Sequence, residues 1–194
     1  MSRLGLYGGS FDPIHNGHLI LARQALEDLK LDRVIFLPAA ESPFKPNHTI
    51  TSAEDRVAMI KLAIEHEPAL SVDLSEIQRP APSYTIDTVR AYRAMHPVDK
   101  LFFLIGEDHL RNLHKWNGFA ELDQLVQFVV LSRSDLPLSI KYPVIHRRFD
   151  LSSTEIRNRV ANQLPISYLV PNTVLHYIKS KKLYQGERLS KLRS

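Results

Sequence analysis

The sequence predicts an α/β fold in which a doubly wound, mostly parallel sheet is covered by helices on both faces. Apolar runs alternate along the chain with segments of helical periodicity, and the run over 101–105 is apolar at every position. Parallel strands that are buried on both faces have this continuous apolar pattern. A Gly-Gly-Ser turn also follows the first run directly, and a turn after the first strand is where such sheets bind phosphate groups.

The N-terminal part of the chain predicts two strands with a helix between them. We expect strands over 4–7 and 34–37, because both runs are short and apolar. Between them, residues 16–29 have the spacing of an amphipathic helix, with an apolar residue at every third or fourth position: Leu19, Ala22, Leu26 and Leu29.

Two further helices are predicted from their start and stop signals. Ser52 followed by Asp55 resembles a capping box, and the apolar face that follows it ends before Pro68. Ser83 is expected to cap another helix, which ends at Pro97.

The remaining apolar runs, 101–105 and 125–131, predict two buried parallel strands. Ser152 with Glu155 forms another capping box and predicts a helix beginning at this point. The alternation of strand and helix indicates one Rossmann-like domain, whose ligands lie beyond the carboxyl ends of the strands.

The length of 194 residues suits a single domain. We expect the domain to cover 1–184, with a basic and flexible tail over 185–194, and a surface loop over 42–49, which contains proline and lysine. The basic residues from Lys179 to Arg193 are expected to be solvated.

Composition excludes several classes of protein. With 44% hydrophobic and 24% charged residues the chain is an ordinary globular protein, and without cysteine it has no disulfide, thiolate metal site or cysteine nucleophile. No signal peptide or membrane-spanning run is visible. A cytoplasmic protein without membrane contact is therefore expected.

The net charge of +4 and the isoelectric point near 9.3 have two interpretations. A basic chain could attract nucleic acid, but the same excess suits a pocket that holds several phosphates. The sign of the charge alone does not choose between them.

The first motif, residues 8–18, lies at the predicted turn from strand to helix. Glycines let the main chain approach a ligand, and the positive end of the following helix favours phosphate. His15 and His18 are three positions apart, so both can face one side of the helix entrance and donate hydrogen bonds to phosphate oxygens.

Two other interpretations of the histidine pair stay open on this pattern. Two histidines could be zinc ligands, although zinc usually needs a third protein ligand and no cysteine is present to supply one. Alternatively, both side chains could simply cap the helix. The context of the surrounding motif favours the phosphate interpretation.

The second motif places three hydroxyl groups at the start of a predicted helix and Arg157 one turn into it. Such a cluster suits the β- and γ-phosphates of ATP. A plain helix cap is the alternative. The hydroxyl residues are Ser152, Ser153 and Thr154.

Together the two motifs resemble the nucleotidylyltransferase superfamily, which has an H-x-G-H element near the N-terminus and an S-S-T-x-[IV]-R element near the C-terminus. Residues 82–88, 105–108 and 42–45, with Trp116, narrow the resemblance to bacterial nicotinate-nucleotide adenylyltransferases. The matches extend over 4–184. Leu151 departs from the isoleucine that is common before the second element.

The resemblance implies a pocket with an ATP half and a mononucleotide half, in which His15, His18 and Arg157 are catalytic. Lys45 would meet the mononucleotide phosphate, and Trp116 would stack on the pyridine ring. The remaining residues implied for the ATP half are Gly8, Gly9, Ser10, Phe11, Gly106, Asp108, Ser153 and Thr154, and those for the mononucleotide half are Tyr84, Thr85 and Arg133.

Each mononucleotide residue also has a plainer interpretation. The single tryptophan could belong to the core, and Lys45 could be solvated. Tyr84 and Thr85 could be only the first turn of a helix. Arg133 is carried over although Ser134 and Asp135 follow it, where proline and glycine are common in the family.

The implied reaction transfers AMP from ATP to nicotinate mononucleotide and releases pyrophosphate, by in-line attack without a covalent intermediate. Mg²⁺ would accompany ATP, with no metal site built from the protein alone. One alternative is pantetheine-phosphate adenylyltransferase, which shares both motifs but typically has a shorter chain and lacks the P-S-Y-T-x-D-T segment. Another is a nucleotide- or RNA-binding module, but no RNA-binding aromatic motif is present, so no nucleic-acid partner is expected.

Overall fold

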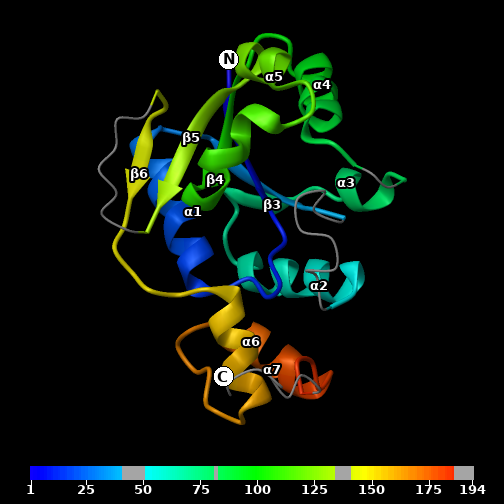
Figure 1. The fold of residues 1–194 in the computed structure, drawn as a ribbon, viewed down its shortest axis with the longest axis vertical. Coiled ribbons are helices and arrows are strands. Elements are labelled where there is room, and N and C mark those ends of the chain that lie inside the picture. Colours follow the sequence, from blue (N-terminus) through cyan, green and yellow to red (C-terminus); the bar gives the residue numbers. More distant parts are fainter. Residues whose placement is uncertain (41–50, 81–82, 134–140, 186–194) are drawn as a thin grey trace.

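The apolar runs assemble into one sheet of six strands in the order β3-β2-β1-β4-β5-β6. In this computed structural model the described residues are 1–40, 51–80, 83–133 and 141–185 (Figure 1). All pairings of the sheet are parallel, which confirms the predicted doubly wound α/β fold. The strands are β1 (Arg3–Gly9), β2 (Arg33–Pro38), β3 (Leu70–Val72), β4 (Lys100–Gly106), β5 (Gln127–Ser132) and β6 (Val144–His146).

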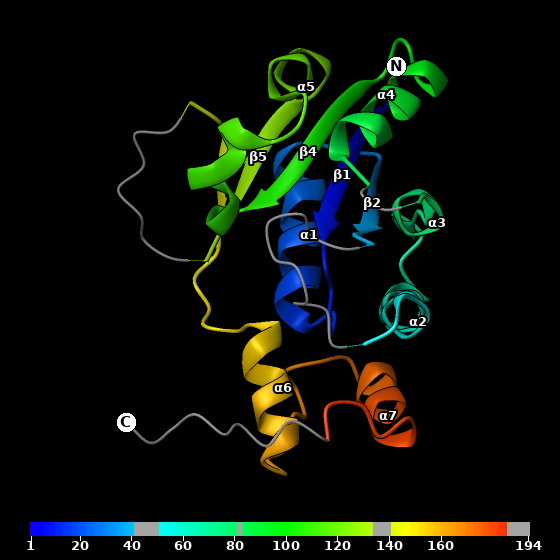
Figure 2. The ribbon, with the colours of Figure 1, turned by 45° about the vertical axis from the view of Figure 1, so that its right-hand side comes forward.

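Helices connect the strands and cover both faces of the sheet (Figures 1 and 2). They are α1 (Asn16–Asp28), α2 (Ala53–Ile64), α3 (Ser75–Gln78), α4 (Thr85–Met95), α5 (Phe119–Leu125), α6 (Ser153–Ala161), α7 (Asn172–Ser180) and the 3₁₀ helix η1 (Glu107–Lys115).

Successive strand residues contribute to two separate cores, because their side chains alternate between the faces of the sheet. In β4, Phe102 and Leu104 pack with apolar residues of α1, α2 and α7, whereas Phe103 and Ile105 pack with those of α4 and α5. Burial on both faces explains why the run over 101–105 is apolar at every position.

The sequence identified several helix starts correctly. The helix predicted over 16–29 is α1, which ends at Asp28 with Leu29 as its C-cap. Ser52 and Ser152 each accept a hydrogen bond from the backbone N–H three residues on, at the starts of α2 and α6. The prediction for Ser83 was wrong, because α4 begins at Thr85 without a side-chain cap. The Ser83 hydroxyl instead accepts a hydrogen bond from Arg79.

Other differences lie in short or late elements. Leu125 ends α5, so the strand predicted from that residue begins at Gln127. Lys181 and Lys182 are exposed, as expected of a solvated segment, but Tyr184 beside them is only 6% exposed. The predicted loop over 42–49 and all but the first residue of the predicted tail lie outside the described residues.

The strand order places a topological switch point between β1 and β4. From β1 the chain leads by α1 to β2 on one side, whereas β4 pairs with the other side of β1. Ligands of doubly wound sheets bind in the crevice at such a point, beyond the carboxyl ends of the strands. In both views α6 lies below this edge of the sheet (Figures 1 and 2).

In the part of the chain that the structure describes, no helix is both long enough and apolar enough to cross a membrane.

Candidate active site

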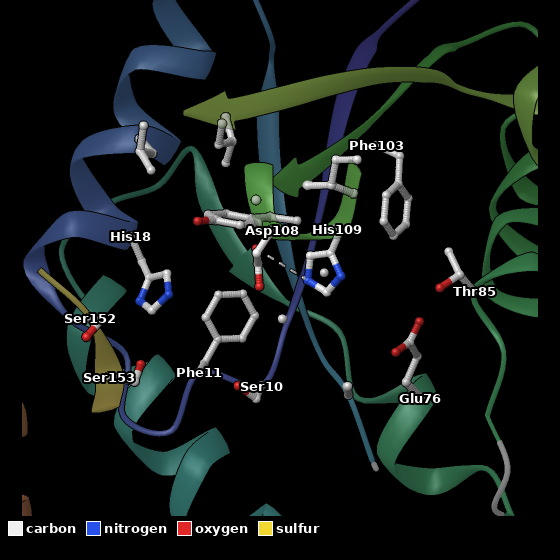
Figure 3. Close-up of a pocket in the computed structure, with 18 of the residues that line it drawn as sticks. Ser10, Phe11, His18, Glu76, Thr85, Phe103, Asp108, His109, Ser152 and Ser153 are labelled. Carbon is white, nitrogen blue, oxygen red and sulfur yellow. Dashed lines mark ion pairs between the residues drawn. The ribbon is translucent and has the colours of Figure 1, made fainter. Parts of the chain in front are cut away.

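A cavity of about 580 Å³ opens at the switch point, between the ends of β1, β4 and β5 and the start of α6 (Figure 3). Lys45 lies outside the described residues. The other residues proposed from the sequence all line this cavity: Gly8, Gly9, Ser10, Phe11, His15, His18, Tyr84, Thr85, Gly106, Asp108, Trp116, Arg133, Ser153, Thr154 and Arg157.

Two hydrogen bonds join the two motifs, which are far apart in the sequence. A guanidinium N–H of Arg157 donates to the backbone oxygen of Asp12 at 2.7 Å. The Ser153 hydroxyl donates to the backbone oxygen of Pro13 at 2.9 Å. The start of α6 is therefore fixed directly against the turn that precedes α1, and His18 and Arg157 line the same cavity.

In the structure the glycines of the first motif make room for neighbouring aromatic rings, and their expected role in letting a ligand approach the main chain stays a prediction. Gly8 and Gly9 belong to β1 and do not take a positive φ. A Cβ on Gly9 would lie 2.9 Å from the Phe11 ring, so this position needs the absence of a side chain. The left-handed residue of the turn is Phe11, with a φ of 49°, a conformation that costs a non-glycine residue about 1 kcal/mol or more.

His15 and His18 form a reciprocal cap at the start of α1. The backbone N–H of His18 donates to His15 Nδ1 at 3.3 Å, and the backbone N–H of His15 donates to His18 Nδ1 at 3.2 Å. The two rings stack with centroids 3.7 Å apart. Since each Nδ1 accepts a hydrogen bond, each neutral ring carries its proton on Nε2.

Both histidines are held neutral. Burial lowers the pKa of His15 to about 3, and burial together with the neighbouring His15 lowers the pKa of His18 well below its ordinary value. His15 Nε2 is buried and has no hydrogen-bond partner among the described residues. The cap interpretation of the histidine pair is confirmed. It is compatible with the phosphate interpretation, because Nδ1 accepts from the helix backbone and Nε2–H remains a donor.

The second side of the cavity is aromatic. Trp116 is half-buried and meets Phe103 and Phe128 edge-on, at centroid distances of 6.1 and 6.3 Å. Its Nε1 is buried without a partner among the described residues. Trp116 therefore contributes both to the core and to the cavity wall, and the first turn of α4 brings Thr85 to the same side (Figure 3).

Arg133 and Asp108 also line the cavity. Arg133 donates to the backbone oxygen of Leu151 at 2.7 Å, just before α6. An added Cβ at Gly106 would lie 2.6 Å from the Asp108 carboxylate. Glycine at this position therefore leaves room for the carboxylate. Asp108 also lies 3.9 Å from His109 Nε2 (Figure 3).

No pattern in the sequence indicated several of the lining residues, of which Glu76 is the most unusual. It is 6% exposed and accepts a hydrogen bond from the Thr88 hydroxyl at 3.1 Å. Burial raises the pKa of its carboxyl group to about 7, and Arg79 opposes that shift. Glu76 lies on α3, a helix of four residues that is too short for a periodic pattern. Other lining residues that the sequence did not indicate are His109, Lys115 and Asn117.

No group of three or more His, Cys, Asp and Glu side chains is arranged to hold a metal ion within the described ranges. The zinc interpretation of the histidine pair therefore has no third ligand there.

The Glu76 carboxyl group is expected to reduce stability as the pH rises. Its pKa in the folded protein is about 7, above the ordinary value of 4.5, so the folded state binds the proton more tightly over this window. The free energy of unfolding then falls as the pH rises through the window. The free energy of unfolding of Glu76→Gln should lack this fall. Relative to that of the parent protein it should therefore rise by on the order of 2 kcal/mol between pH 5 and pH 8. Urea unfolding at both pH values measures this, and a difference independent of pH would contradict it.

Comparison with known proteins gives a consistent result. A family model described as cytidylyltransferase-like matches residues 6–159. A probable nicotinate-nucleotide adenylyltransferase of Methylacidiphilum infernorum is 45% identical over 192 residues, covering 96% of this chain and 94% of the relative. The nicotinate-nucleotide adenylyltransferase of Bacillus subtilis is 39% identical over 189 residues, covering 96% of this chain and all (100%) of the relative.

Solved structures share the fold. The nicotinic acid mononucleotide adenylyltransferase of Plasmodium falciparum, complexed with APC, superposes with a TM-score of 0.78 at 18% identity, covering 96% of this chain and 99% of that one. The same enzyme complexed with NaAD gives the same TM-score of 0.78 at 20% identity and the same coverage, 96% and 99%. The cavity, the two motifs and the full-length similarity thus agree, and the chain belongs to the nicotinate-nucleotide adenylyltransferase family.

Proposed function

We propose that this protein transfers AMP from ATP to nicotinate mononucleotide, giving nicotinate adenine dinucleotide and pyrophosphate. The observation that carries the proposal is the single cavity lined by both motifs and by Trp116. Relatives that are 36–45% identical over nearly the whole chain carry the name of this activity.

The two sides of the cavity support a division between the substrates. His18, Ser152 and Ser153 lie on one side, and Thr85 lies on the other (Figure 3). Donors at the starts of α1 and α6 suit the phosphates of ATP. The aromatic side with Trp116 suits a flat pyridine ring, and Thr85, Tyr84 and Arg133 are assigned to the same substrate.

In this proposal an oxygen of the mononucleotide phosphate attacks the α-phosphate of ATP in line, and pyrophosphate leaves. The attacking group is part of the substrate, so the protein contributes position and charge stabilisation. The Nε2–H groups of His15 and His18 donate as neutral hydrogen-bond donors, and Arg157 provides a permanent positive charge. Donors fixed before the reaction stabilise charge without reorganisation.

Mg²⁺ would enter with ATP. The donor set suits this arrangement, because Asp108 faces the cavity with a side chain that is half exposed (50%), and the ATP oxygens and water can complete the coordination. When bound, the ion would add positive charge beside the phosphates.

The assay that tests the proposal measures pyrophosphate release with ATP, Mg²⁺ and one of three acceptors. Nicotinate mononucleotide should give the highest kcat/KM, above nicotinamide mononucleotide, and phosphopantetheine should give no release. Preferred turnover of phosphopantetheine would instead identify a pantetheine-phosphate adenylyltransferase. Salt-sensitive RNA binding with no pyrophosphate release from any acceptor would favour a nucleic-acid-binding module.

His18→Ala should lower kcat by about a hundredfold, because it removes one preorganised donor at the phosphates. His114→Ala on η1 is a matched control, since His114 is exposed and is not among the residues that line the cavity. Circular dichroism checks that α1 persists without one half of its cap. A His18→Ala variant with the parent turnover would refute the role.

Trp116→Ala should weaken the binding of nicotinate mononucleotide by on the order of 1 kcal/mol, because a stacking face is lost. The binding of ATP should be weakened less. Trp116→Phe keeps an aromatic face against Phe103 and Phe128 and should recover part of the loss. Isothermal calorimetry with each substrate measures the two affinities. An equal loss for both substrates would speak against stacking.

A further inference from the structure

A buried carboxylate, that of Asp12, lies next to the cavity but is not among the residues that line it. Asp12 is 1% exposed, and a buried carboxylate must be matched by donors. Its Oδ1 accepts from the Thr51 hydroxyl at 2.5 Å and from the Tyr184 hydroxyl at 2.7 Å. Both donors are distant in sequence, so the carboxylate joins three separate parts of the chain.

The backbone of the same residue receives Arg157, whose guanidinium donates to the Asp12 oxygen at 2.7 Å. Arg56, itself 1% exposed, donates to the backbone oxygen of Ser10 at 2.8 Å. The turn over residues 10–13 is thus held by hydrogen bonds to the Asp12 carboxylate and to the backbone oxygens of Ser10 and Asp12. Phe11, in its left-handed conformation, lies between these two residues. A shift of Asp12 would displace both Phe11 and Arg157, which line the cavity.

Tyr184 reaches Asp12 from the end of the described chain, after α7. The chain turns back between α7 and Tyr184, where the Leu183 N–H donates to the backbone oxygen of Ile178 at 3.0 Å. Tyr184 itself takes a φ of 63°. Its side chain is 6% exposed and joins the core beside α1 and α7. Burial and the Asp12 carboxylate raise the pKa of its hydroxyl group, which therefore stays a donor at neutral pH.

We propose that Tyr184 is a positioning residue for adenylyl transfer, which acts by holding the Asp12 carboxylate and thereby the turn and Arg157. The inference rests on the proposed function and extends it to a residue outside both motifs. Because Arg157 belongs to the ATP half, removal of the Tyr184 hydroxyl should affect the reaction of ATP, while the mononucleotide half is left in place.

A second tyrosine provides a matched control. Tyr177 on α7 also donates its hydroxyl to a carboxylate, Asp55 Oδ1, at 2.8 Å. That bond joins α7 to the first turn of α2, and neither residue lines the cavity. Tyr177→Phe and Tyr184→Phe therefore delete the same group and the same kind of bond, one outside the site and one beneath it.

Tyr184→Phe should lower kcat about tenfold and raise KM for ATP by a similar factor, with KM for nicotinate mononucleotide unchanged within about twofold. A tenfold change corresponds to about 1.4 kcal/mol, which is in the range of one hydrogen bond to a charged group. Tyr177→Phe should keep both constants within about twofold of the parent. If Tyr177→Phe shows the same loss, or Tyr184→Phe shows none, the proposal is overturned.

A double-mutant cycle separates positioning from a general loss of stability. Residues that act through one another are not additive, so Tyr184→Phe should have no further effect on kcat in the Arg157→Ala background. A tenfold loss that persists there would overturn the proposal. Thr51→Val removes the other hydroxyl donor of Asp12 and should change kcat in the same direction as Tyr184→Phe, which gives a second test if that variant folds poorly.

An inactive parent protein would refute the proposed function and not this inference. The affinities of both tyrosine variants for ATP are then compared by calorimetry. A Kd about tenfold weaker for Tyr184→Phe alone would support the inference, and equal Kd values for the two variants would overturn it.

Discussion

The candidate active-site cavity depends on the contact between the turn before α1 and the start of α6, whose more buried hydrogen bond runs from the Arg157 guanidinium to the backbone oxygen of Asp12. This bond joins residues that are 145 positions apart and brings α6 to the edge of the sheet where β1 ends. Arg157 is only 8% exposed, so its charge needs acceptors inside the protein. The same guanidinium also donates to the Thr154 hydroxyl at 3.2 Å, which fixes its orientation toward the cavity.

With this contact formed, the electrostatics of the site are divided between permanent and neutral groups. The buried histidines have lowered pKa values because burial disfavours the charged ring. In the proposed reaction they would serve as directional donors, whereas Arg157 and Arg133 carry guanidinium cations. If both histidines were protonated, their positive charges would line the empty cavity together with those of Arg157 and Arg133, and these charges would repel one another. Neutral rings that are already hydrogen-bonded at Nδ1 avoid this cost and still present donors.

Local signals in the sequence predicted much of the fold, and the resemblance of the two motifs to a known family implied most of the proposed site. The periodicity of 16–29 and the cap at Ser152 depend on neighbouring residues only, so they could be read directly. The roles of Ser83, of Gly9 and of the chain near Tyr184 depend on partners far away in sequence. Arg79, the Phe11 ring and Asp12 determine them, and no spacing pattern encodes such contacts.

The polar cluster beneath the cavity is the part of the molecule least suited to stability alone. Buried charges such as those of Asp12 and Arg56 are costly to desolvate, and an apolar replacement of similar volume is often as stable. Here the cluster is compensated by two apolar cores on the faces of the sheet. Apolar contacts would leave the turn over 10–13 free to slide, whereas hydrogen bonds to a carboxylate and to carbonyls have a direction. The cluster therefore fixes the left-handed Phe11 and the donors of Arg157 in one arrangement, as a site that binds a triphosphate requires.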